Sequence, residues 1–166
     1  CHETDLTYRK TFAPKTVAVV GAGPAGLACA TVAAERGHRV TLFDAADEIG
    51  GQFNYAKRIP GKEEFHETLR YFRHRLEETR VDVKLSTPAT AADLTGFDEV
   101  VLATGITPRR VAFPGADHAK VVSYVDVLSG RVKVGARAAL SGAGGIGFDV
   151  AEYLTHEGHS PSLDPA

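Results

Sequence analysis

The sequence predicts an α/β fold with a doubly wound parallel sheet. Thr16–Val20 is a short, β-branched and apolar run that is followed at once by glycines and by a helix of small residues over Leu27–Glu35. Arg39–Phe43 repeats the strand pattern, and Phe97–Gly105 repeats it again further along the chain. Continuous apolar runs separated by helices are typical of parallel strands that are buried on both faces. The predicted architecture is therefore Rossmann-like.

The first glycine-rich loop has the spacing G-x-G-x-x-G at Gly21, Gly23 and Gly26. Gly21 allows a tight turn, Gly23 lets a phosphate approach the backbone, and Gly26 lets the helix pack close to the strands. Pro24 and Ala25 open the helix, where the missing N–H of proline costs nothing. Free N–H groups and a partial positive charge at the helix N-terminus then favour the pyrophosphate of a dinucleotide.

An acidic residue follows the second strand. Asp44 comes about 20 positions after Gly21, where a carboxylate accepts hydrogen bonds from the adenosine ribose. Its neighbour Ala45 is included in the predicted site. A carboxylate here repels a 2′-phosphate, so the site is expected to prefer FAD or NAD over NADP.

Two further motifs favour FAD over NAD. The first opens a loop just past the second strand and comprises Gly50, Gly51 and Gln52. The second ends the later strand and comprises Ala103, Thr104 and Gly105. In flavoproteins with two dinucleotide sites, an Ala-Thr-Gly in this place returns the chain beneath the flavin-linked nucleotide. NAD binding stays open as an alternative, and so does a glycine turn that only packs a helix on a sheet.

The middle of the chain contains further predicted elements. Lys62–Thr79 has an apolar stripe at helical spacing, and Val81–Leu85 alternates like a strand. Thr87–Thr95 is predicted as an irregular or helical link. Val121–Leu128 is predicted as a strand followed by a helical turn, and Ser129–Gly135 as a domain boundary.

A second G-x-G-x-x-G precedes another predicted helix, and its glycines are Gly142, Gly144 and Gly147. Ile146, Val150 and Tyr153 recur at helical spacing, and Gly158 is placed to cap the helix end. The preceding run, Ala138–Ser141, is poor in β-branched residues and is a weak strand candidate. A complete nucleotide site also needs a second strand and a ribose-binding residue. We therefore expect half of a site, packed as an extra strand and helix.

Composition excludes several classes of function. The net charge is −2, with acidic and basic residues interspersed, which gives no footprint for nucleic acid. No apolar run approaches the roughly 20 residues that span a bilayer, and the N-terminus lacks a signal-peptide core. Cys1 and Cys29 make no metal-binding pattern, and no catalytic constellation is visible, so we predict no catalytic and no metal-ligating residues. A cytoplasmic location is the default expectation.

The motifs together resemble a known family. VAVVGAGPAG, the GGQFN–IPGKEEF–TLRYF stretch, VVLATGITPR and GAGGIGFDVAEYL are similar to the bacterial NADPH-dependent 2,4-dienoyl-CoA reductases, which belong with old yellow enzyme and trimethylamine dehydrogenase. The resemblance implies a parent with an FMN-carrying barrel, an iron–sulfur cluster, an FAD domain and an inserted NADPH domain. It implies that electrons pass from NADPH to FAD, then through the cluster to FMN.

This chain resembles only the start of the C-terminal half of such proteins. We expect an N-terminal extension over residues 1–15, an incomplete FAD-binding domain over 16–130, and the start of an NADPH-binding domain over 131–166. We expect a fragment that binds FAD without turning over alone. A dinucleotide- or ADP-binding module without redox activity is the alternative, and an amine dehydrogenase is an alternative parent. The expected partners are a small-molecule dinucleotide and a second copy meeting it at the truncated sheet edge.

Overall fold

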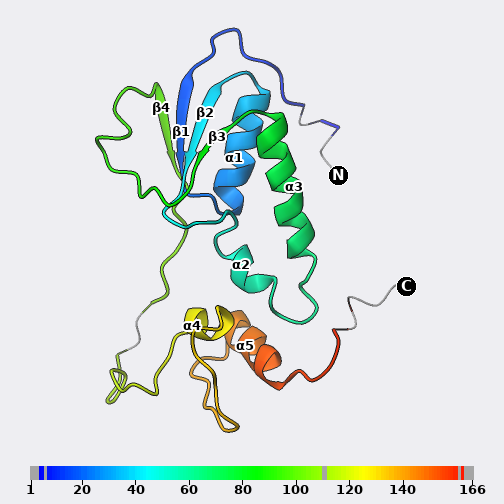
Figure 1. Cartoon of the computed structure of the whole chain (residues 1–166), viewed down its shortest axis with the longest axis vertical. Coiled ribbons are helices and arrows are strands. Elements are labelled where there is room, and N and C mark those ends of the chain that lie inside the picture. The colour runs from blue at the N-terminus through cyan, green and yellow to red at the C-terminus, as the bar shows by residue number, and fades with distance from the viewer. Residues whose placement is uncertain (1–3, 6, 110–111, 161, 163–166) are drawn as a thin grey trace. The chain divides into compact units, whose positions relative to one another are not determined.

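The computed structural model describes residues 4–5, 7–109, 112–160 and 162 of this chain (Figure 1). They form two compact units. The first unit comprises Cys1–Phe53 and Glu67–Gly105, and the second comprises Asn54–His66 and Ile106–Ala166. Cys1, for which no metal role was predicted, lies outside the described residues. The expected boundary at residue 130 between two nucleotide-binding domains stays a prediction.

The first unit is built on a four-stranded parallel sheet (Figure 1). Its strands are β1 (Thr16–Val20), β2 (Arg39–Phe43), β3 (Asp82–Lys84) and β4 (Glu99–Leu102). They lie in the order β3-β2-β1-β4, so the chain moves outward from β1 to β3 and then returns to the other side of β1. This reversal brings the carboxyl ends of β1 and β4 together at a topological switch point, where sheets of this class bind ligands. The predicted α/β, Rossmann-like fold is confirmed.

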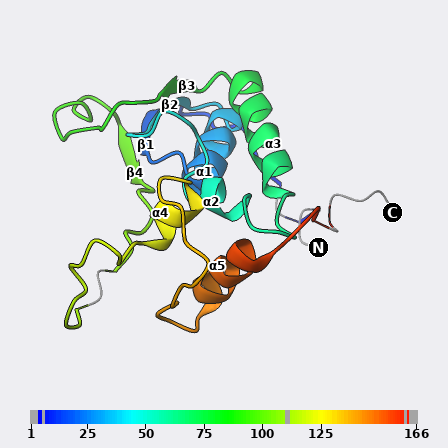
Figure 2. The same cartoon turned by 60° about the horizontal axis from the view of Figure 1, so that its bottom comes forward.

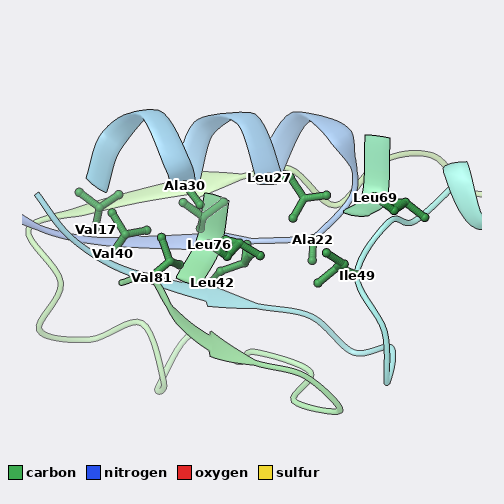
Figure 3. Close-up of a cluster of buried hydrophobic side chains, with 11 residues drawn as sticks. Val17, Ala22, Leu27, Ala30, Val40, Leu42, Ile49, Leu69, Leu76 and Val81 are labelled. Atoms are coloured by element: carbon green, nitrogen blue, oxygen red, sulfur yellow. The ribbon is translucent and has the colours of Figure 1, made fainter. Parts of the chain in front are cut away.

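Two helices cover one face of this sheet. They are α1 (Pro24–Glu35) and α3 (Phe65–Glu78). Leu27 and Ala30 of α1 point toward the strands, and Leu69 of α3 joins the same buried cluster (Figure 3). The apolar stripe predicted for Lys62–Thr79 is therefore confirmed as core. Cys29 packs against this cluster, and burial raises the pKa of its thiol.

The ends of α1 follow from its flanking residues. Pro24 is the first helical residue, in the first turn as the sequence predicts, and Gly23 before it is the N-cap residue. At the other end, Gly37 adopts φ of 101°, and its N–H donates to the carbonyl of Ala34. This left-handed glycine ends the helix and turns the chain into β2.

One expectation for β4 is wrong for the described residues. Its apolar pattern predicts a strand buried on both faces, but Val100 is 42% and Leu102 is 72% exposed. Val101 between them packs against the core. Side chains of a strand alternate between the two faces of the sheet, and among the described strands β4 pairs only with β1, at an edge. One side of its apolar run is therefore covered and the other is not.

The second unit corrects two strand predictions. Val121–Ser123 is not a strand, because Ser123 instead caps α4 (Tyr124–Leu128) in a reciprocal capping box with Asp126. Ala138–Ser141 is also not a strand: the described residues around it form no sheet for it to join. The predicted extra strand is thus absent there, while the helix α5 (Gly145–Thr155) is present.

The second unit has a small core of its own. α4 and α5 lie side by side (Figure 2), and their buried side chains pack with Ile59. Lys62 pairs with Asp149 on α5 at 2.7 Å, and the N–H of Gly61 donates to the hydroxyl of Ser160. A short helix, α2 (Phe53–Ala56), was not predicted, because four residues carry too little periodicity.

The Asp98 carboxylate, just before β4, forms hydrogen bonds with the first residue of β1, and these bonds make stability depend on pH. One oxygen of Asp98 accepts hydrogen bonds from the backbone N–H and the hydroxyl of Thr16, both at 2.7 Å. These bonds hold the pKa of Asp98 below its ordinary value of 3.8. A lowered folded-state pKa contributes stability above the unfolded-state value, and this contribution is lost as the pH falls through the folded-state value.

We therefore expect Asp98→Asn to lower the Tm modestly at neutral pH. The difference from the parent chain is expected to shrink as the pH falls below the ordinary value of 3.8, because protonation removes the same charge. Thermal unfolding followed by circular dichroism at several pH values measures it. A Tm difference that stays constant over this range contradicts the assignment.

Candidate nucleotide-binding site

The first glycine loop joins β1 to α1 in a conformation that only glycine fits. Gly21 has φ of 109°, and a Cβ placed on it would lie 2.3 Å from the carbonyl oxygen of Ala103. A Cβ on Gly26 would lie 1.7 Å from the carbonyl oxygen of Gly21. Real Cβ atoms do not approach backbone so closely. The two glycines therefore allow the turn and the start of α1 to pack directly against each other and against the end of β4.

The Ala-Thr-Gly turn lies directly against this loop. The N–H of Ala103 donates to the carbonyl of Val20 at 2.8 Å, which extends the pairing of β1 and β4 into the turn. Thr104 and Gly105 follow as exposed residues, and Gly105 has φ of 74°. Two motifs about 80 positions apart in the sequence are therefore adjacent at the switch point.

Asp44 lies at the end of β2 beside the same loop. Its Oδ2 accepts a hydrogen bond from the N–H of Ala22 at 2.5 Å, and its Oδ1 accepts one from the N–H of Ala46 at 2.8 Å. A carboxylate has about four acceptor positions, so each oxygen keeps capacity for a ribose hydroxyl. Ala45, the next residue, is exposed.

The Gly-Gly loop closes over the phosphate-binding loop. The N–H of Gly50 donates to the carbonyl of Ala22 at 2.8 Å. Gly51 adopts φ of 52°, and a Cβ there would lie 3.0 Å from the Cα of Gly23. Gln52 follows as a half-buried residue of the same loop. The predicted residues of the first site therefore come together at one end of the sheet.

This end of the sheet fits the adenosine diphosphate part of a dinucleotide. A Cβ on Gly23 would meet no atom within 4 Å, which leaves open space at the N-cap of α1. The first turn of α1 itself carries no acidic side chain. The helix N-terminus can hold a pyrophosphate while Asp44 holds a ribose. Contacts of individual residues with a bound nucleotide stay predictions.

The second glycine loop repeats the local geometry of the first. A Cβ on Gly147 would lie 2.2 Å from the carbonyl oxygen of Gly142. The same close approach occurs in the first loop, between a Cβ on Gly26 and the carbonyl oxygen of Gly21. Gly144 caps α5 with φ of −89° and ψ of 179°, close to the −74° and 179° of Gly23. The setting differs, because Gly142 has no neighbouring atom that a Cβ would meet within 4 Å. Gly142, Gly144 and Gly147 thus form a turn with the local shape of the first loop, but no strand directly precedes it among the described residues.

Sequence reasoning missed the backbone groups that fix this site. The N–H and the carbonyl of Ala22 both form hydrogen bonds with the segment after β2, but alanine carries no side-chain signal for this.

Within the described residues, no group of three or more His, Cys, Asp or Glu side chains is placed to hold a metal ion. Over those residues, no helix combines the length and the apolar character needed to cross a membrane.

Comparisons with known proteins agree with this geometry. Residues 15–162 match the family model described as pyridine nucleotide-disulphide oxidoreductase. The metal reductase of Desulforamulus reducens is 35% identical over 94% of this chain. The N,N-dimethylglycine/sarcosine dehydrogenase of Chromohalobacter salexigens is 42% identical over 87% of it. The structure of 2-naphthoyl-CoA reductase in complex with 2-naphthoyl-CoA matches 89% of it, with a TM-score of 0.86 and 36% identity.

These relatives are much longer than this chain. The matched region makes up 24% of the metal reductase, 22% of the dehydrogenase and 23% of the naphthoyl-CoA reductase chain. The chain thus spans about a quarter of the length of the curated relatives it matches.

Proposed function

The chain belongs to the pyridine nucleotide-disulphide oxidoreductase family, and from this we propose that it is the FAD-binding, electron-transferring part of an NADPH-dependent flavoprotein oxidoreductase. Its cofactor is FAD, held by its adenosine diphosphate part at the first glycine loop. FAD supplies a carrier that takes up a hydride from a nicotinamide and passes the electrons on singly or in pairs. The protein contributes binding, orientation and the exclusion of competing groups.

The observation that carries this proposal is the close approach of Gly21 to Ala103, whose carbonyl oxygen would lie 2.3 Å from a Cβ at Gly21. This approach places the phosphate-binding loop next to the Ala-Thr-Gly turn. Both lie at the end of the sheet that also carries Asp44, the proposed ribose-binding residue. A plain nucleotide site needs only the loop and the acid. The added turn favours FAD over NAD as the nucleotide of this loop.

For the parent reaction we propose reduction of an unsaturated acyl-CoA of the 2,4-dienoyl-CoA type. Hydride would pass from NADPH to FAD, and electrons would continue through an iron–sulfur cluster to FMN in the longer protein. The match to a reductase bound to 2-naphthoyl-CoA supports a thioester substrate. The 42% identity to a dimethylglycine/sarcosine dehydrogenase supports amine oxidation as the second candidate.

We also propose that the 166-residue chain does not complete this reaction alone. Its described residues form a nucleotide-binding site, and among them no group of three or more His, Cys, Asp or Glu side chains is placed to hold a metal ion. The flavin would then be held and reduced only as part of a larger electron path. NADPH-dependent reduction of a dienoyl-CoA by the purified chain contradicts this part of the proposal.

The first experiment is the visible absorption spectrum of the purified chain after incubation with FAD and desalting. We expect a retained flavin band, and we expect ADP to displace it in a concentration-dependent way. The matched competitor is 2′-phospho-ADP, which is expected to compete at least about tenfold more weakly because its extra phosphate faces the Asp44 carboxylate.

Three outcomes separate the hypotheses. Retained flavin with ADP selectivity supports the proposal. ADP binding without retained flavin favours a dinucleotide- or ADP-binding module without redox activity. Equal competition by both diphosphates contradicts the placement of the ribose at Asp44.

A further inference from the structure

We infer that Asp44 positions the phosphate-binding loop itself, in addition to contacting the ribose. This inference rests on the proposed function, because it concerns the same nucleotide site. A ribose-binding carboxylate needs to face only the ligand. The Asp44 carboxylate instead bonds to the backbone of the loop that receives the pyrophosphate, at Ala22.

The peptide groups around Ala22 are held from both sides by the segment that follows β2. The N–H of Ala22 donates to Oδ2 of Asp44 at 2.5 Å, and the carbonyl of Ala22 accepts from the N–H of Gly50 at 2.8 Å. Ala22 is itself fully buried, so these groups have no water to replace a lost partner. Gly51 packs onto the Cα of the next residue, Gly23. Asp44, Gly50 and Gly51 therefore hold the first half of the loop in place.

The carboxylate is held in place by the backbone around it. The N–H of Asp44 donates to the carbonyl of Lys84 at 2.9 Å, and its carbonyl accepts from the N–H of Thr87 at 2.8 Å. Its Oδ1 accepts from the N–H of Ala46 in the same turn. The side chain therefore acts from a fixed point at the end of the sheet, and a charge-assisted bond from such a point is a strong one.

This arrangement has a consequence for ligand binding. With the Ala22 peptide fixed, the left-handed turn at Gly21 and the extended N-cap at Gly23 are set before a nucleotide arrives. A preorganised site binds more tightly because the ligand does not have to order it. Asp44 therefore supports the pyrophosphate site even for a ligand that offers it no hydroxyl.

The two possible roles of Asp44 predict different effects of Asp44→Asn on the affinity for a nucleotide without ribose hydroxyls. If Asp44 only contacts the ribose, then Asp44→Asn leaves binding of a nucleotide without ribose hydroxyls unchanged or makes it tighter, because a negative charge near the phosphates is removed. If Asp44 positions the loop, the same change weakens binding of that nucleotide. An asparagine carbonyl cannot replace both carboxylate oxygens, so one of the two backbone donors at Ala22 and Ala46 loses its acceptor.

The test uses the full chain and 2′,3′-dideoxyadenosine 5′-diphosphate, with affinities measured by calorimetry. We expect Asp44→Asn to weaken this ligand by about tenfold, and Asp44→Ala to weaken it further. Asp47→Asn is the matched control: it makes the same charge change in the same loop at an exposed side chain, and is expected to leave the affinity unchanged.

A second measurement does not depend on any nucleotide. Amide hydrogen exchange of Ala22 in the ligand-free chain is expected to be slow in the parent and in Asp47→Asn, and at least about tenfold faster in Asp44→Asn. Unchanged exchange at Ala22 together with unchanged or tighter binding of the dideoxy nucleotide in Asp44→Asn overturns the inference. Failure of the parent chain to bind any adenosine diphosphate overturns the proposed function instead, and the Ala22 exchange then decides the positioning role alone.

Discussion

Replacement of Gly26 by alanine is expected to abolish flavin retention and to destabilise the first unit by roughly 3 kcal/mol or more. The added methyl group would lie 1.7 Å from the carbonyl oxygen of Gly21, and that oxygen belongs to backbone. Neither a rotamer change nor a side-chain shift relieves such a contact, so the start of α1 has to move away from β1. Helix propensity alone favours alanine over glycine by about 1 kcal/mol, so a loss of stability reports the clash.

The second glycine loop provides the matched control for this variant. Gly147→Ala introduces the same kind of contact, at 2.2 Å from the carbonyl of Gly142, but in the other unit. We expect it to destabilise α5 and to leave flavin retention unchanged. Gly145→Ala, where a Cβ meets no atom within 4 Å, is expected to be tolerated. Visible spectra and thermal unfolding measure all three variants, and loss of flavin in Gly147→Ala contradicts the assignment of FAD to the first loop.

Leu42→Ala is expected to destabilise the chain by about 2–5 kcal/mol. Leu42 lies on β2 in the buried cluster between the sheet and its helices, with no exposed surface (Figure 3). Truncation removes apolar contacts and leaves a cavity that rigid strand neighbours cannot close. A domain of this size has a free energy of unfolding of about 5–15 kcal/mol, so this is a large fraction of it.

Leu102→Ala is the control for this prediction, because it removes the same atoms from a neighbouring part of the sheet. Leu102 is 72% exposed on β4, so the substitution is expected to change the free energy of unfolding by less than about 0.5 kcal/mol. Urea denaturation of both variants measures the difference. Equal destabilisation by the two substitutions means that the outer face of β4 is covered in solution, for example by the second copy that the open edge predicts.

Most of the first unit could be predicted from the sequence. The strand at Thr16–Val20, the helix after Gly26 and the strand at Arg39–Phe43 are confirmed, because each is set by local pattern and by glycine or proline at its ends. The approximate positions of the helix in Lys62–Thr79 and of the strand in Val81–Leu85 are confirmed as well. The spacing of apolar residues is a local property, and these segments are long enough for it to distinguish a helix from a strand.

The errors have a different origin. Val121–Ser123 and Ala138–Ser141 have apolar residues, but no strand among the described residues pairs with them, and a strand exists only through a neighbour. The exposure of Val100 and Leu102 likewise depends on which elements lie beyond β4 and not on the residues of β4 itself. Sequence patterns within one segment contain no information on these partners.

The sequence by itself determined the residue types of the nucleotide site: the glycine spacing, Asp44, the Gly-Gly loop and the Ala-Thr-Gly turn. Only the tertiary structure decided that Gly21 abuts Ala103 and that Asp44 bonds to the backbone of Ala22. The physical reason is that these contacts run through backbone atoms, which every residue shares and no side-chain pattern records. Parallel pairing of β1 with both β2 and β4 creates them, because it brings the ends of three distant segments to one edge of the sheet.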